Sequence, residues 1–76
     1  MTIQSILFKK TIYHTRGSAK RWVVKNKYLG SIRPDPNPES LNFWRFRQRQ
    51  PEEFKPDSFY IKRYNNSIYF VIGQLK

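Results

Sequence analysis

Three arginines near the middle of the sequence carry the clearest potential for chemistry. Arg45, Arg47 and Arg49 alternate with Phe46 and Gln48, and this alternation places the arginines on one face of a β-strand. Successive arginines then stand about 6.6 to 6.8 Å apart, which is close to the interval between neighbouring phosphates of a nucleic-acid strand. A guanidinium group binds phosphate through two parallel N–H donors. The pattern therefore predicts contacts with a phosphate backbone.

A structural role is the alternative for these arginines. Their guanidinium groups could lie over the rings of Phe43 and Tyr60 and pair with Glu52, Glu53 or Asp57, stabilising the sheet or a protein contact. However, five acidic residues cannot neutralise fifteen basic ones. We therefore favour phosphate contact.

Residues for catalysis or metal binding are sparse. His14 is the only histidine, cysteine is absent, and no carboxylate lies within ten residues of His14, whereas a metal site or nucleophilic triad needs several such groups. Glu52 and Glu53 are adjacent, so in an extended segment they point to opposite sides and cannot flank one bond. The three glycines are isolated, which excludes a glycine-rich phosphate loop. We expect no enzymatic activity, no cofactor and no metal.

The distribution of charge is strongly asymmetric. The 76 residues carry a formal net charge of +10, and all five acidic residues lie between Asp35 and Asp57. The first 34 residues hold eight basic side chains and no acidic one. A field of one sign concentrates polyanions and speeds their capture. The alternatives are a basic surface that only serves solubility and the codon bias of an AT-rich genome.

Length and composition predict a single small domain, residues 1–76. Without cysteine no disulfide can support it, and aromatic residues, 17% of the chain, must supply much of the core. The apolar stretch Ile6–Phe8 is too short for a signal peptide or a membrane span. We therefore expect a protein that is neither secreted nor membrane-bound.

Hydrophobic periodicity predicts a strand at 4–8 and a helix at about 16–27, with Thr15 as the N-cap. Ala19, Trp22 and Val23 share one side of this helix, and we expect Trp22 in the core rather than stacked on a ligand. Burial of that side leaves three cations outside. These are Lys20, Arg21 and Lys25.

A proline-rich loop is predicted at about 30–41, followed by a two-faced strand at 42–50 that ends at Pro51. Phe54 in the next link is expected to point inward. Strands at 58–64 and 67–73 flank Asn65-Asn66, a pair that suits a two-residue type I′ turn.

That turn predicts the register of the hairpin and places Arg63 opposite Ile68. One face then consists of apolar side chains: Phe59, Ile61, Ile68, Phe70 and Ile72. The other face combines phenol rings with a lysine: Tyr60, Lys62, Tyr64 and Tyr69. The predicted fold class is α+β, a small, mostly antiparallel sheet of three to four strands with one helix packed on one face, in the order β-α-β-β-β.

Several segments, in the same order, resemble a family of small proteins of tailed phages and large DNA viruses. They are Ser5–Phe8, Ser18–Asn26, Phe43–Gln48, Pro51, Phe54, Ser58-Phe59 and Val71–Lys76. The chain departs from the family pattern in its proline-rich loop, at Tyr60 and at Asn65-Asn66. The resemblance implies a viral setting, in the host-cell cytoplasm or the virion, and a helix-on-sheet module; it implies no enzymatic activity.

These observations predict a non-enzymatic viral protein that binds DNA or RNA through the phosphate backbone, largely without sequence specificity. The candidate contacts are basic side chains and two tyrosines: Lys20, Arg21, Lys25, Arg45, Arg47, Arg49, Lys62, Arg63, Tyr60 and Tyr69. The alternative is a virion structural or assembly protein that docks on an acidic protein partner, such as another viral structural protein. A ribosome-associated role is a third option, and the sheet edges could also pair in an oligomer.

Overall fold

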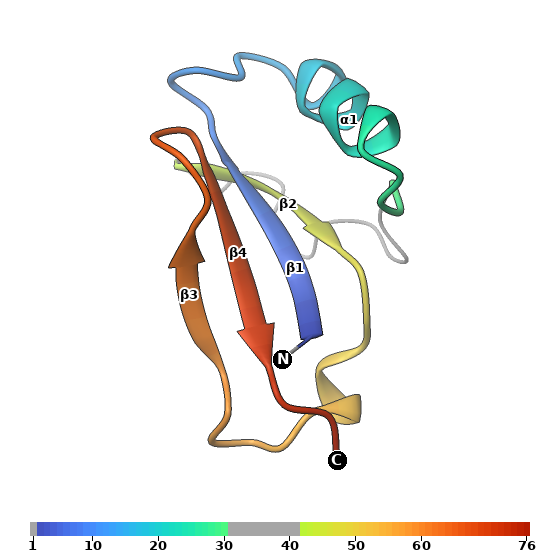
Figure 1. The fold of residues 1–76 in the computed structure, drawn as a ribbon. Coiled ribbons are helices and arrows are strands. Elements are labelled where there is room, and N and C mark those ends of the chain that lie inside the picture. The colour runs from blue at the N-terminus through green and yellow to red at the C-terminus, as the bar shows by residue number, and fades with distance from the viewer. Residues whose placement is uncertain (1, 31–41) are drawn as a thin grey trace.

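A computed structural model describes residues 2–30 and 42–76. Within them lie four strands, one α-helix and one short 3-10 helix (Figure 1). In chain order the elements are β1 (Thr2–Lys9), α1 (Arg16–Lys25), β2 (Phe43–Arg47), η1 (Pro51–Glu53), β3 (Tyr60–Arg63) and β4 (Ile68–Gly73). The predicted proline-rich loop lies, apart from Gly30, outside the described residues.

The four strands form one antiparallel sheet in the order β2-β1-β4-β3, with α1 on one side of it (Figure 1). β1 is therefore an inner strand, and it pairs with β2 on one side and with β4 on the other. Ile6, for example, lies opposite Phe46 in β2 and Phe70 in β4. This arrangement confirms the predicted α+β class and the order β-α-β-β-β.

The core lies between α1 and the sheet face that α1 covers. Its buried members come from the helix and three strands: Ile6, Phe8, Ala19, Val23, Phe46, Ile68, Phe70 and Ile72. Phe8 lies at the centre, with its ring edge-on to Tyr13, Trp22 and Phe46 at centroid distances of 5.1, 5.6 and 5.4 Å. Aromatic rings thus supply three of the eight buried members and the centre of the core, in line with the large share that the composition predicted.

The helix begins as predicted and ends earlier. The Thr15 hydroxyl accepts a hydrogen bond from Ser18 N at 3.2 Å, which satisfies one backbone donor of the first turn. At the other end, Lys27 has a φ of 64°, Lys27 N donates to Val24 O, and Tyr28 N donates to Val23 O. These bonds form a Schellman motif. The helix therefore stops at Lys25 rather than Lys27.

Trp22 packs beside the core but is only partly buried. Its ring stacks on Tyr28 at 6.0 Å and meets Tyr64 edge-on at 5.7 Å. Tyr28 immediately follows the Schellman turn, so that turn brings its ring onto Trp22. The expectation that Trp22 has a structural role agrees with these contacts.

The hairpin prediction was wrong by one residue. Arg63 lies opposite Tyr69 rather than Ile68, and Tyr60 lies opposite Ile72. Among the described non-glycine residues only Lys27 has a positive φ, which excludes a type I′ turn at Asn65-Asn66. Instead, Tyr64 N donates to Ile68 O, and the Asn65 side chain accepts from Ser67 N and Ile68 N at 2.8 Å.

The new register exchanges the two faces of β3. Residues directly opposite each other in an antiparallel pair share a face. Tyr60 and Lys62 therefore lie on the same face as Ile72 and Phe70, the side that carries α1. Ile61, predicted to be in the core, lies on the opposite face and is 64% exposed.

A second, smaller apolar cluster holds the end of the sheet near the C-terminus. Phe54 is 1% exposed, as predicted, and forms an antiparallel bridge with Leu75. Its ring lies 5.3 Å from that of Phe59, which is 38% exposed and not in the main core. Gly73 leaves room for both rings: a Cβ there would lie 2.7 Å from Phe54 Cδ2.

Candidate nucleic-acid interface

The sheet face opposite α1 gathers basic side chains from three strands, β1, β2 and β3, and a tyrosine from β4. Because Phe46 points to the core, Arg45 and Arg47 point to the other face. Lys9 from β1 and Arg63 from β3 share this face with them, as the strand register shows. We call this surface the arginine face and define it by Lys9, Arg45, Arg47, Arg63 and Tyr69.

The register aligns the arginine face in rows that cross the sheet. One row runs from Arg45 through Leu7 and Tyr69 to Arg63. Neighbouring strands are about 4.8 Å apart, so the backbones at the two ends of this row are roughly 14 Å apart. A positively charged side chain thus stands at each end, with a phenol ring and a leucine between them.

Tyr69 is the central aromatic ring of this face. It is half-buried, meets Phe43 edge-on at 5.6 Å, and has the Lys9 ammonium 5.6 Å from its centroid. Proteins that bind single-stranded nucleic acids combine aromatic rings with cations, because bases stack on the rings while the cations bind phosphates. The arginine face therefore offers both kinds of contact.

The three predicted helix residues lie on the other side of the molecule. Lys20, Arg21 and Lys25 are exposed on α1, which buries Ala19 and Val23 against the covered sheet face. Helix and strand cations are thus separated by the core. The sequence prediction grouped them in one set of nucleic-acid contacts, and the described residues divide them between two opposite surfaces instead.

The two predicted residues from the start of β3 also lie apart from the arginine face. Tyr60 and Lys62 are exposed on the α1 side of this edge strand and line a groove with Ile3, Tyr64, Phe70 and Ile72. Arg63 of the arginine face borders the same groove. The one-residue shift of the hairpin separates them from Tyr69, which the sequence placed on the same face.

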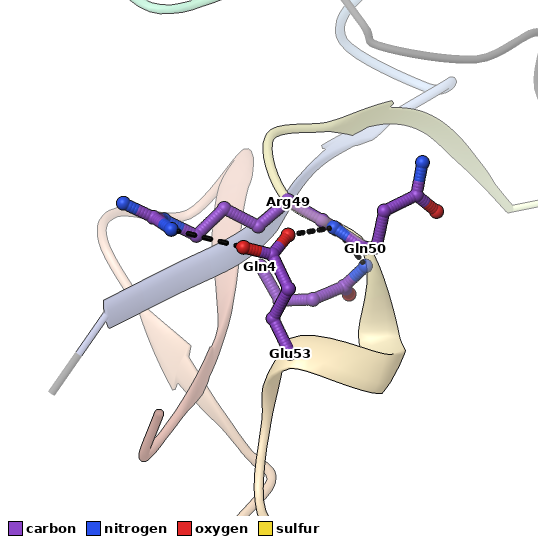
Figure 2. Close-up of polar contacts among 4 residues, drawn as sticks. All are labelled: Gln4, Arg49, Gln50 and Glu53. Carbon is purple, nitrogen blue, oxygen red and sulfur yellow. Dashed lines mark hydrogen bonds and ion pairs between the residues drawn. The ribbon is translucent and has the colours of Figure 1, made fainter. Parts of the chain in front are cut away.

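Arg49 has a structural role of its own, at the end of β2 (Figure 2). Its guanidinium group donates to Glu53 Oε1 at 3.1 Å, and the other carboxylate oxygen of Glu53 accepts from Gln50 N at 2.9 Å. The buried Gln4 side chain donates to Arg49 O at 3.0 Å. The alternative of pairing with an acidic residue thus holds for Arg49. Glu53 thus organises this turn.

The sequence prediction missed Lys9 as a member of the arginine face. The available signal was the alternation of Ser5, Leu7 and Lys9, which continues one residue beyond the predicted end of the strand. It also missed Arg16, which lies over the Phe46 ring at 4.2 Å and donates to Arg45 O at 3.2 Å. That contact joins the first turn of α1 to β2, and no local pattern indicates it.

Within residues 2–30 and 42–76, the acidic side chains are confined to the segment between β2 and β3. They are Glu52, Glu53 and Asp57. The described strands and α1 therefore carry no carboxylate side chain. The same part of the chain contains no group of three or more histidine, cysteine or acidic residues placed to hold a metal ion.

None of the described helices has the length and apolar character needed to cross a bilayer. Comparison of the chain with protein-family models, curated proteins and solved structures gave no match.

Proposed function

We propose that this chain is a non-enzymatic viral protein that binds nucleic acid through the phosphate backbone, using the arginine face. The observation that carries the proposal is the concentration of Lys9, Arg45, Arg47 and Arg63 on one sheet face, beside the Tyr69 ring. Guanidinium groups suit phosphate, and backbone contacts carry no sequence information by themselves. Binding is therefore largely independent of sequence.

The viral setting, in the host-cell cytoplasm or the virion, rests on the resemblance described above. Its quoted segments fall on β1, α1, β2, η1 and β4. They thus include both the apolar centre of the fold and the two arginines of β2, and the sequence resemblance supports the setting and the proposed surface together.

The salt dependence of binding tests the proposal directly. If the four cations of the arginine face each neutralise one phosphate, log K on duplex DNA falls against log salt with a slope of about −3.6. Arg45→Gln combined with Arg47→Gln removes two such contacts and is expected to reduce the magnitude of this slope by about 1.8. Fluorescence anisotropy of a labelled duplex over a salt series measures both values.

The matched control for that experiment is Lys55→Gln combined with Lys76→Gln. This pair removes the same charge from exposed positions near the smaller apolar cluster, and we expect it to leave the slope nearly unchanged. Equal slopes for the two double variants would show that net charge, rather than the arginine face, governs binding. Complete absence of binding to duplex and single-stranded probes at low salt would refute the proposed function.

Tyr69→Ala is expected to discriminate between single-stranded and duplex nucleic acid. Loss of a stacking ring costs about 1 to 3 kcal/mol per base, or roughly 5- to 150-fold in affinity, whereas bases paired within a duplex cannot stack on it. Tyr69→Phe keeps the ring and should bind single strands nearly as the unmodified protein does. An equal loss on both probes, measured by anisotropy on variants with unchanged melting temperatures, would contradict a stacking role.

An acidic protein partner is the alternative function, and the exposed Tyr60 and Tyr64, 48% and 56% accessible, favour it. Tyrosine is enriched at protein interfaces. Competition separates the two functions, because polyglutamate offers carboxylates without bases or phosphates. If polyglutamate displaces a labelled single strand at equal charge concentration, and Tyr69→Ala does not affect either ligand, the acidic partner becomes the better assignment.

A further inference from the structure

The outer side of α1 forms a second basic surface, separate from the arginine face. It consists of Lys20, Arg21, Val24 and Lys25, which surround a shallow groove over Gly17. All four side chains are exposed, and Val24 is 60% accessible. We call this the helix surface. It faces away from the sheet because Ala19 and Val23, on the other side of α1, are fully buried in the core.

Helix stability accounts for only part of the charge on the helix surface. Lys25 lies in the last turn, where a cation favours the helix dipole. Arg21 and Lys25 are four residues apart, as are Arg16 and Lys20, and like charges at this spacing destabilise a helix. The first turn contains no acidic residue, although an acidic residue there would favour the helix dipole. A polyanion bound across Lys20, Arg21 and Lys25 would remove this repulsion.

We infer that the helix surface binds a second nucleic-acid segment, so that one molecule bridges two segments held on opposite sides. The inference rests on the proposed function, which assigns the first segment to the arginine face. The occupant follows from charge: three exposed cations without a neighbouring described carboxylate match a phosphate backbone. The apolar floor of the groove, formed at Val24, suits the sugar edge of such a backbone.

The geometry permits both surfaces to be occupied at once. The domain measures 23 Å along its shortest principal axis, whereas electrostatic interactions fade over about 8 Å at physiological ionic strength. Two backbones on opposite sides are therefore screened from each other. Since the surfaces lie on different layers of the fold, a straight duplex bound to one leaves the other available.

Energy transfer between two short duplexes, one carrying a donor dye and one an acceptor, tests the bridge. With the full chain at low salt we expect the transfer to rise with protein concentration and to pass a maximum. It then falls, because at excess protein each duplex binds its own protein molecules and bridges are lost. We expect the triple variant of the helix surface to abolish the transfer while its affinity for a single duplex, measured by anisotropy, changes by less than threefold. It combines Lys20→Gln, Arg21→Gln and Lys25→Gln. Glutamine keeps a helix propensity close to that of lysine and arginine.

The matched control is Lys55→Gln, Lys62→Gln and Lys76→Gln combined, which removes the same charge outside both surfaces and should keep the transfer. If circular dichroism shows that the triple variant of the helix surface does not fold, single variants replace it. Arg21→Gln and Lys25→Gln should then each reduce the maximum transfer at least twofold.

Three outcomes would overturn the inference. Binding of single duplexes without any transfer would refute the bridge and leave the proposed function standing. Full transfer by the helix variants, or equal loss in the control, would show that the helix surface is not the second site. Absence of duplex binding altogether would refute the proposed function and this inference with it.

Discussion

Phe8→Ala is expected to unfold the domain, or nearly so, at room temperature. The Phe8 side chain is fully buried and contacts three other rings, from Tyr13, Trp22 and Phe46. Removal of such a ring costs about 3 to 5 kcal/mol. A domain of this length is stable by only about 4 to 11 kcal/mol, so this change removes much of the total. Urea denaturation followed by circular dichroism measures the loss.

Two controls make the Phe8 result specific. Phe8→Leu keeps most of the buried volume and should cost considerably less than the alanine variant. Ile61→Ala removes an apolar side chain that is 64% exposed, and we expect a change within about 0.5 kcal/mol. A Phe8→Ala midpoint close to that of the unmodified protein would mean that the ring cluster does not hold the helix on the sheet.

The second large effect concerns Phe54 and Gly73 in the smaller apolar cluster. Phe54→Ala should lower the free energy of unfolding by about 3 to 5 kcal/mol, because the side chain is 1% exposed. Gly73→Ala alone should cost about 1 to 3 kcal/mol, since its Cβ would lie 2.7 Å from Phe54 Cδ2. Both values come from urea denaturation.

The double variant is the sharper measurement of this contact. With the Phe54 ring already absent, Gly73→Ala no longer meets Cδ2 and should cost much less than in the unmodified protein. The two changes are therefore expected to be non-additive. Additive losses would show that the Phe59 ring, whose Cδ1 would lie 3.1 Å from the new Cβ, rather than the Phe54 ring requires glycine there.

The helices and strands of this fold were predictable where the spacing of apolar residues was regular and where a capping residue marked the start of the helix. Thr15 and the Ala19–Val23 stripe located the helix, and the alternation around Phe46 separated core from arginine face. The helix end was not predictable in the same way. Its left-handed position holds Lys27, whereas glycine is the usual signal for such a turn.

The register of the β3–β4 hairpin was not predictable from its pattern. All four residues of β3 are exposed, so neither of its faces is strongly selected by burial, and weak selection leaves register to the turn. The turn in fact uses the Asn65 side chain as a hydrogen-bond acceptor. That single shift moved Tyr60 and Lys62 away from Tyr69.

The residues of the predicted site lie on two opposite surfaces for a related reason. The sequence indicates which side of each element is basic, and Arg45, Arg47, Lys20 and Arg21 all point outward as expected. Once α1 packs its apolar side on the Phe46 side of the sheet, the two basic sides necessarily face opposite directions, and that packing joins segments distant in the sequence. The Arg49–Glu53 pair, in contrast, joins residues only four positions apart in the sequence.

The central position of β1 governs how this chain can reach its native state. Ile3 pairs with Ile72, and Phe8 with Ile68, so the middle of the sheet joins the earliest strand to the last. Topologies dominated by such distant pairings fold slowly for their size. On the ribosome, β1 must therefore wait until β4 has been synthesised before its second neighbour exists, and its apolar side remains exposed to chaperones or to aggregation during that interval.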